Sequence, residues 1–128
     1  MPTVSEGQST LPIADGLLAW LRQHSPELDC GALCSAESVR QLADHGWLRL
    51  GVPEAVGGRG GGLDVVVEAI ARVAAECLTS AFVFWCQRVF VEYLVQTPNE
   101  PLRQMLLTEV LEARRFGATG LSNAMKHL

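Results

Sequence analysis

The glycine-rich stretch from Trp47 to Asp64 is the first place where residue types and spacing suggest chemistry. Its sequence is WLRLGVPEAVGGRGGGLD, with one proline and six glycines. Glycine-rich loops can wrap a phosphate group, because their backbone approaches the ligand closely. The spacing does not fit, because Leu63 and Asp64 follow Gly62 where a P-loop has Lys and Ser or Thr, and Leu63 takes the third glycine position of the dinucleotide pattern. We therefore interpret the stretch as a tight connector between two packed helices.

The candidate metal ligands are four cysteines and three histidines. Cys30 and Cys34 are four positions apart, with His24 upstream. Structural zinc sites usually contain two such pairs, and the sequence has no second pair. Cys77 and Cys86 fall on apolar helix faces, where a thiol behaves as a small hydrophobic group. No metal site is predicted.

Polar side chains on a strongly apolar segment form a third candidate group. The segment at residues 81–95 contains Gln87, Arg88 and Glu92. Buried polar groups need partners, and Arg88 and Glu92 are four positions apart, so they can pair with each other on a helix. Gln87, and Ser80 at the start of the segment, are left either to face a cavity or to bond to neighbouring backbone.

Self-contained catalysis has little support in the sequence. His24, His45 and His127 cannot be combined with a serine or cysteine into a catalytic set from their spacing. The scattered glutamates read as solvated helix faces. No catalytic residue is assigned.

Composition indicates a folded single domain. The chain has 128 residues, of which 48% are hydrophobic, with a net charge of −4 and a pI near 5.3. This charge argues against a nucleic-acid partner. Residues 1–10 lack the pattern of a signal peptide and are expected to be disordered. The apolar run at 81–95 is shorter than the roughly 20 residues that a bilayer requires, so we expect a cytoplasmic protein without a membrane span.

Apolar periodicity predicts helices at residues 11–24, 36–45, 64–77, 81–96 and 100–115. Pro26 is expected to end the first helix, and Gly46 to follow the second. Ser80 and Asn99 are expected to cap the last two.

The fifth helix is expected to turn five apolar residues inward: Leu102, Met105, Leu106, Val110 and Leu111. The tail FGATGLSNAMKHL has no helical stripe and reads as a first strand and turn. The fold class is therefore all-α, an orthogonal or up-down bundle of about five helices with a short extended carboxy-terminal stub.

The order of these features resembles the amino-terminal helical domain of acyl-CoA dehydrogenases. The matching segments are LADHGWLRLGVPEAVGGRGGGLD, LTSAFVFWCQ, TPNEPLRQMLL and FGATGLSN. The resemblance extends over about residues 36–123. They carry a Val-Pro-Glu turn followed by glycines, a helix that begins near Ser-Ala, and a helix with Pro-Leu-Arg-Gln. The ordered series, more than any single motif, makes the resemblance specific.

The resemblance implies FAD-dependent α,β-dehydrogenation of acyl-CoA thioesters, as in fatty acid metabolism. The family fold is a helical domain, a middle β domain and a four-helix bundle, so residues 11–116 are expected to form the first and residues 117–128 to begin the second. The catalytic Glu would lie beyond Leu128. The isolated chain is not expected to hold FAD tightly or to be active, and the full-length protein is expected to be a homotetramer or homodimer.

The resemblance also suggests site residues. The start of the fourth helix usually lines the acyl pocket, which implies Ser80, Val83, Phe84 and Gln87. The strand after the fifth helix usually lies near the flavin, which implies Phe116, Ala118 and Thr119.

The tail departs from the family pattern. Thr119-Gly120-Leu121 stands where Thr-Glu-Pro is usual, and Ala124-Met125-Lys126 replaces Gly-Ser-Asp. The superfamily also contains flavin monooxygenases, which these departures leave open. A rival of another class is a non-catalytic helical module for an apolar ligand or a partner helix. That rival predicts a closed surface, whereas a domain of a larger enzyme would expose an apolar patch.

Overall fold

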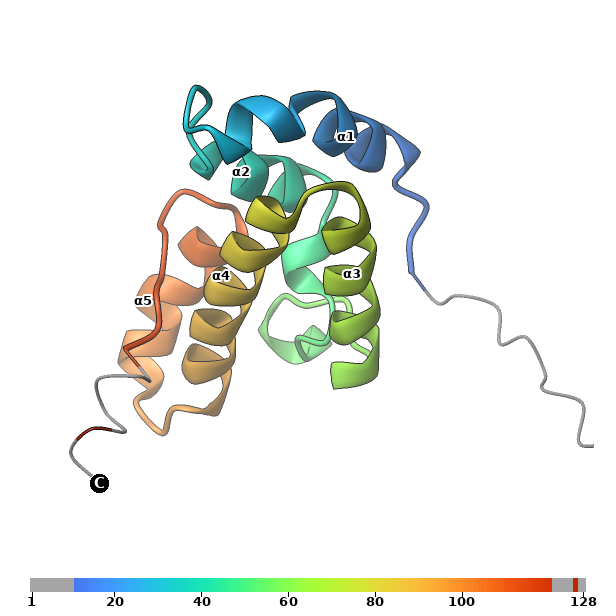
Figure 1. The fold of residues 1–128 in the computed structure, drawn as a ribbon. Helices are drawn as coiled ribbons and strands as arrows, with labels where there is room; N and C mark the ends of the chain where they lie inside the picture. Colours follow the sequence, from blue (N-terminus) through green and yellow to red (C-terminus); the bar gives the residue numbers. More distant parts are fainter. Residues whose placement is uncertain (1–10, 121–125, 127–128) are drawn as a thin grey trace, which may run out of the picture.

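The computed structural model describes residues 11–120 and 126, and contains five α-helices and two single-turn 3-10 helices within them (Figure 1). The elements in chain order are α1 (Asp15–Asp29), α2 (Ala36–Asp44), η1 (Trp47–Arg49), η2 (Glu54–Val56), α3 (Leu63–Glu76), α4 (Leu78–Gln96) and α5 (Glu100–Leu111). The all-α prediction is confirmed, and no strand occurs in the described part of the chain. The predicted disordered terminus at 1–10 and most of the predicted β-domain start lie outside the described residues.

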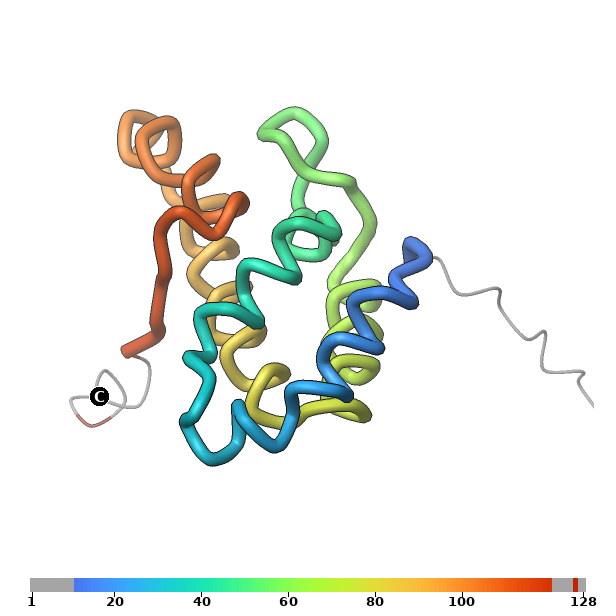
Figure 2. Tube along the Cα trace, turned by 90° about the horizontal axis from the view of Figure 1, so that it is seen from above, coloured from blue at the N-terminus to red at the C-terminus, as the bar shows by residue number. Residues whose placement is uncertain are grey.

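Helix α4 is the centre of the bundle, since it contacts α1, α2, α3 and α5. Figures 1 and 2 show α3 and α5 on either side of α4, while α1 and α2 lie across one end. The segment after α5 runs back beside α4. Large side chains buried at this centre include Phe84, Trp47 and Leu42. Every other helix is therefore positioned through its contact with α4.

The length of α4 differs from the sequence expectation. It has 19 residues, and among the described helices it alone is long and apolar enough to cross a membrane by length and composition. Core helices of soluble bundles have the same property. Here the helix is covered by its neighbours on one face, whereas Phe82 and Tyr93 on the other are exposed. The absence of a membrane span stays a prediction.

Helix α4 begins before Ser80, so the predicted Ser80 cap is wrong. Cys77 is the N-cap, and its Sγ accepts hydrogen bonds from the backbone N–H of Ser80 at 3.4 Å and from the Ser80 hydroxyl at 3.2 Å. A buried thiol here has the role that an oxygen side chain usually has at an N-cap. Cys77 therefore ends α3 and starts α4, and it makes the turn between them very short.

Two predicted boundaries are confirmed. Gly46 follows α2 with a left-handed φ of +74°. The Asn99 side chain caps α5 by accepting from Leu102 N–H at 3.1 Å.

Two other expectations are wrong. Pro26 lies inside α1, because buried Leu28 holds the last turn and the helix stops only before Gly31, where φ is +77°. Met105 is 63% exposed, because α5 packs on α4 mainly through Leu107 and Val110.

The glycine connector is held by its own backbone. Two hydrogen bonds cross it: Gly51 N–H donates to Gly60 O, and Gly60 N–H donates to Val52 O, each at 2.8 Å. The N–H groups of Gly58 and Arg59 also donate to backbone carbonyls within the loop. These amides are unavailable to a phosphate, which supports the interpretation of the stretch as a connector.

Arg88 of α4 attaches this connector to the core. The side chain is almost completely buried, and it donates from Nε to Leu50 O and from Nη2 to Gly51 O, both at 3.2 Å. Its Nη1 pairs with Glu92 Oε2 at 2.8 Å, as the spacing predicted. The buried charge is therefore both hydrogen-bonded and neutralised.

The close approach at Gly58 generates a stability prediction. A Cβ at this position would lie 1.9 Å from Val52 O, which is backbone and cannot move aside easily. Gly58→Ala should therefore lower the free energy of unfolding by about 3 kcal/mol, in the upper range of overpacking effects. Urea denaturation measures this, with Gly120→Ala as control, since nothing lies within 4 Å of that position. Equal midpoints for the two variants would contradict the prediction.

The Arg88–Glu92 pair generates a pH prediction. Burial raises the pKa of Glu92, but hydrogen bonds from Gln96 and Arg88 and the charge of Arg88 outweigh it, so the net pKa is lowered. A folded-state pKa below the unfolded value of about 4.3 means that ionised Glu92 stabilises the fold above that pH and loses its effect as the pH falls further. The stability advantage of the unaltered protein over Glu92→Gln should therefore shrink on acidification.

Urea titrations at neutral pH and below about pH 4 would measure this advantage. Glu68→Gln is the matched control, because Glu68 forms an i,i+4 pair with Arg72 at 3.6 Å on the surface, where such pairs contribute little. An advantage over Glu92→Gln that grows toward acid pH would refute the prediction.

Candidate functional site

A cavity of about 290 Å³ lies where α2, α4 and the segment after α5 meet. Four of the seven residues suggested by the resemblance line it, namely Val83, Gln87, Phe116 and Ala118. The remaining lining residues are Cys34, Ser35, Ala36, Val39, Cys86 and Gly117. The fold thus brings together two residue groups that were assigned separately to acyl-pocket and flavin-adjacent roles.

Gln87 has the most constrained side chain in this cavity. It is 1% exposed, and its Nε2 donates to the carbonyls of Val110 and Arg115, each at 3.0 Å. Its Oε1 accepts from Gly117 N–H at 2.9 Å. Of the two possibilities left open by the sequence, bonding to backbone is the one observed. Gln87 presents only the remainder of its side chain to the cavity.

The other suggested residues do not line the cavity. Ser80 and Phe84 are fully buried within the bundle, and the Ser80 hydroxyl lies 2.8 Å from the Ser38 hydroxyl. This contact ties α4 to α2. The Thr119 hydroxyl lies 3.2 Å from the Tyr93 hydroxyl, farther along α4. Ser80 therefore contacts a neighbouring helix, and Thr119 connects the segment after α5 to α4. Their roles in a site stay predictions.

The wall formed by the segment after α5 is held by packing as well as by Gln87. The Phe116 ring, 46% exposed, lies 5.5 Å from the Arg40 guanidinium of α2. Such a cation–π contact orients the ring. Gly117 packs directly against Phe90 of α4. The wall therefore contacts both helices that flank the cavity.

The lining determines which ligands the cavity suits. It contains no Asp, Glu, Lys, Arg or His. Its side-chain polar atoms that could contact a ligand are the Ser35 hydroxyl and the thiols of Cys34 and Cys86. Burial raises the pKa of the Cys86 thiol, which favours its neutral form. The cavity therefore suits an uncharged, mainly apolar group.

Sequence reasoning missed the contribution of α2. Cys86 could have been found, since it stands three positions after Val83 on the same helix face. Cys34, Ser35 and Val39 carry no such signal, because they reach the cavity only through the packing of α2 on α4.

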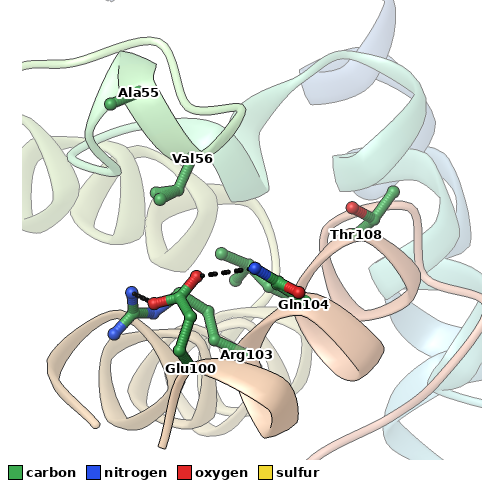
Figure 3. A pocket seen from close by; sticks show the side chains of 7 residues that line it. Ala55, Val56, Glu100, Arg103, Gln104 and Thr108 are labelled. Atoms are coloured by element: carbon green, nitrogen blue, oxygen red, sulfur yellow. Dashed lines mark hydrogen bonds and ion pairs between the residues drawn. The ribbon is translucent and has the colours of Figure 1, made fainter. Parts of the chain in front are cut away.

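A second recess, of about 350 Å³, lies between η2 and α5 (Figure 3). Figure 3 shows the Glu100 carboxylate paired with both Arg103 and Gln104. Arg103 also donates to Leu94 O at 3.0 Å and Thr97 O at 2.5 Å. The charged side chains that line this recess, Glu100 and Arg103, already bond to each other and to the end of α4. The recess is therefore a weaker candidate for ligand binding.

Metal and phosphate sites have no support in the described residues. They contain no group of three or more His, Cys, Asp or Glu side chains that could hold a metal ion. Cys30 is exposed on the surface, and of the two cysteines considered as candidate ligands only Cys34 lines the cavity. In the glycine connector, the N–H groups of Gly51 and of residues 57–60 donate to carbonyls of the connector itself.

The fold and cavity define the class of protein as a small helical domain with an apolar recess beside its central helix. The model of the family "Acyl-CoA dehydrogenase, N-terminal domain" matches residues 19–114, so the chain belongs to the acyl-CoA dehydrogenase family. Comparisons with curated proteins and with solved structures found no match. Val83 and Gln87 fall inside the matched region, whereas Phe116, Ala118 and Thr119 follow it.

Proposed function

We propose that this domain supplies part of the acyl and flavin surroundings in an FAD-dependent acyl-CoA dehydrogenase-like oxidoreductase. The observation that carries the proposal is the apolar cavity between α2, α4 and the segment after α5, in a domain of this family. The substrate class is an acyl-CoA thioester, and the reaction is α,β-dehydrogenation.

The lining fits a hydrocarbon chain better than a polar one. Val39, Val83 and Phe116 supply apolar surface on different elements. Gln87 cannot form a hydrogen bond with a polar substituent of the ligand, because its amide already bonds to three backbone groups. A buried polar group without a partner is destabilising, so the cavity selects an apolar acyl group and leaves the CoA moiety outside.

The residues present fit one edge of a flavin ring. Phe116 and Ala118 line the cavity on the side of the segment after α5, and an aromatic side chain beside small residues leaves room for a flat ring. When bound, FAD would supply the hydride acceptor. The occupied amides of the glycine connector do not fit the pyrophosphate. No carboxylate lines the cavity, so the base that removes the α-proton would come from other residues of the enzyme.

Exposed apolar side chains on α3 and α4 favour a domain that is covered by further protein surface. They are Leu63, Val67, Leu78, Phe82 and Trp85. Three of these gather in the groove between the two helices. A self-sufficient ligand-binding module would be expected to have a closed surface, so this patch supports the enzyme-domain proposal over that rival.

A cavity-filling substitution tests the acyl site. In the flavin-loaded enzyme that contains this domain, Val83→Phe should raise KM for long acyl-CoA thioesters about tenfold while short ones are affected less, because one or more methylene-sized volumes are removed from an apolar pocket. Steady-state kinetics over a chain-length series, with an artificial electron acceptor, gives the measurement.

The control is Met105→Phe, which introduces phenylalanine at a position that is 63% exposed on α5, outside the apolar patch on α3 and α4. It should leave the chain-length profile unchanged. If both variants alter the profile equally, the acyl-site assignment is wrong. An oxygen-dependent hydroxylated product, in place of the enoyl thioester, would assign the enzyme to the flavin monooxygenases.

A flavin titration tests whether this domain needs the other parts of the enzyme to bind FAD and to oxidise the substrate. The chain of 128 residues alone should neither bind FAD stoichiometrically nor oxidise an acyl-CoA, because its described residues offer one edge of a flavin site and no base. Fluorescence titration with FAD and an acceptor-dye assay measure the two properties. Stoichiometric binding or turnover would overturn this part of the proposal.

A further inference from the structure

Gln87 links α4 to three points of the chain around the end of α5. Its two amide N–H groups donate to Val110 O and Arg115 O, and its Oε1 accepts from Gly117 N–H. Two carbonyls and one N–H define which end of the amide is oxygen, so the side chain can take only one orientation. An almost fully buried side chain with both kinds of polar atom engaged is a rigid connection.

Glycine is required where this connection meets the segment. A Cβ at position 117 would lie 2.0 Å from Cδ1 of Phe90 and 2.5 Å from its Cβ. The backbone at Gly117 therefore lies directly on α4, one helical turn from Gln87. Gly117 therefore both accepts close packing against Phe90 and donates a hydrogen bond to Gln87, and the two contacts hold residues 115–118 against α4.

We propose that Gln87 is a positioning residue, which holds residues 115–118 as one wall of the cavity and so couples the acyl pocket to the flavin-adjacent segment. We call the three hydrogen bonds of Gln87, together with the contact of Gly117 with Phe90, the clamp. The catalytic meaning of the clamp rests on the proposed function, but its existence does not. The resemblance suggested Gln87 as an acyl-pocket residue. The structure gives it a different task, since its polar atoms contact backbone and not the cavity contents.

Loss of the amide should release the wall. Gln87→Leu keeps a side chain of similar size but leaves Val110 O, Arg115 O and Gly117 N–H without their partner. Backbone groups without partners move toward water when they can. Because residues 115–120 are not part of any helix, this segment can move while α4 and α5 stay folded.

The cysteines provide the measurement within the chain itself. Cys86 lies half-buried in the cavity, Cys30 is exposed away from it, and Cys77 is buried in the core. Alkylation of Cys86 by iodoacetamide, followed by mass spectrometry, should be about tenfold faster in Gln87→Leu, the factor expected when a wall held by a few hydrogen bonds opens. Rates at Cys30 and Cys77 should be unchanged, because neither depends on the wall.

Gly117 provides a second route to the same result. Gly117→Ala should accelerate Cys86 alkylation to a similar extent, because the added methyl group pushes the segment away from Phe90. The double variant should be no faster than either single variant, since both release one wall. Gly120→Ala is the control, with nothing within 4 Å of the added methyl group.

Two results would overturn the clamp, whatever the enzyme does. One is an unchanged Cys86 rate in both Gln87→Leu and Gly117→Ala. The other is a parallel rise at Cys77, which would mean general unfolding. If Gln87→Leu does not fold, Gly117→Ala and the control still decide the question.

The catalytic meaning is tested separately in the flavin-loaded enzyme. Gln87→Leu should lower kcat and shift the flavin absorbance spectrum more than it raises KM, because the segment beside the flavin moves while Val39 and Val83 of the acyl lining stay in place. Faster Cys86 alkylation with unchanged kcat and spectrum would retain the clamp and refute its coupling to catalysis. No turnover in the unaltered enzyme would instead count against the proposed function.

Discussion

Two adjacent buried polar residues on α4, Gln87 and Arg88, are the constraint on which the rest of the structure depends. They point to different sides of the helix and are 1% and 3% exposed. Each binds backbone of a segment that has no regular structure of its own: Gln87 binds the segment after α5, and Arg88 binds the glycine connector. Since an unsatisfied buried polar group costs about 1–3 kcal/mol, each segment is held where it satisfies its partner on α4.

This arrangement explains how an all-helical domain can position non-helical backbone beside a cavity. Residues 115–118 have no helical hydrogen bonds, so Gln87 and the contact of Gly117 with Phe90 take their place. The glycine connector lies on the Arg88 side. Its N–H groups donate to its own carbonyls, so these groups do not bind a ligand and the connector serves in packing. Consecutive residues of α4 thus have different roles: Arg88 holds the glycine connector, and Gln87 holds the segment that lines the cavity.

Sequence patterns predicted the helices better than the details at their ends. The helices α2 to α5, the Asn99 cap and the turn at Gly46 depend on local rules, and they are confirmed. The Cys77 cap and the continuation of α1 past Pro26 depend on burial, which local rules do not contain. The site shows the same division. The family resemblance implied Val83 and Gln87, whereas nothing in the sequence pointed to Cys34 and Ser35, just before α2, or to Val39 on it, as lining residues.

The sequence by itself determined the fold class, the family and the Arg88–Glu92 pair, because periodicity, ordered motifs and i,i+4 spacing act over short distances along the chain. Only the tertiary structure decided what Gln87 does. Its partners are 23 to 30 positions away, and hydrogen bonds over that separation exist only after α4 and α5 have packed. The same packing brings α2 to the cavity, so the site belongs to the assembled helices and to no single stretch of sequence.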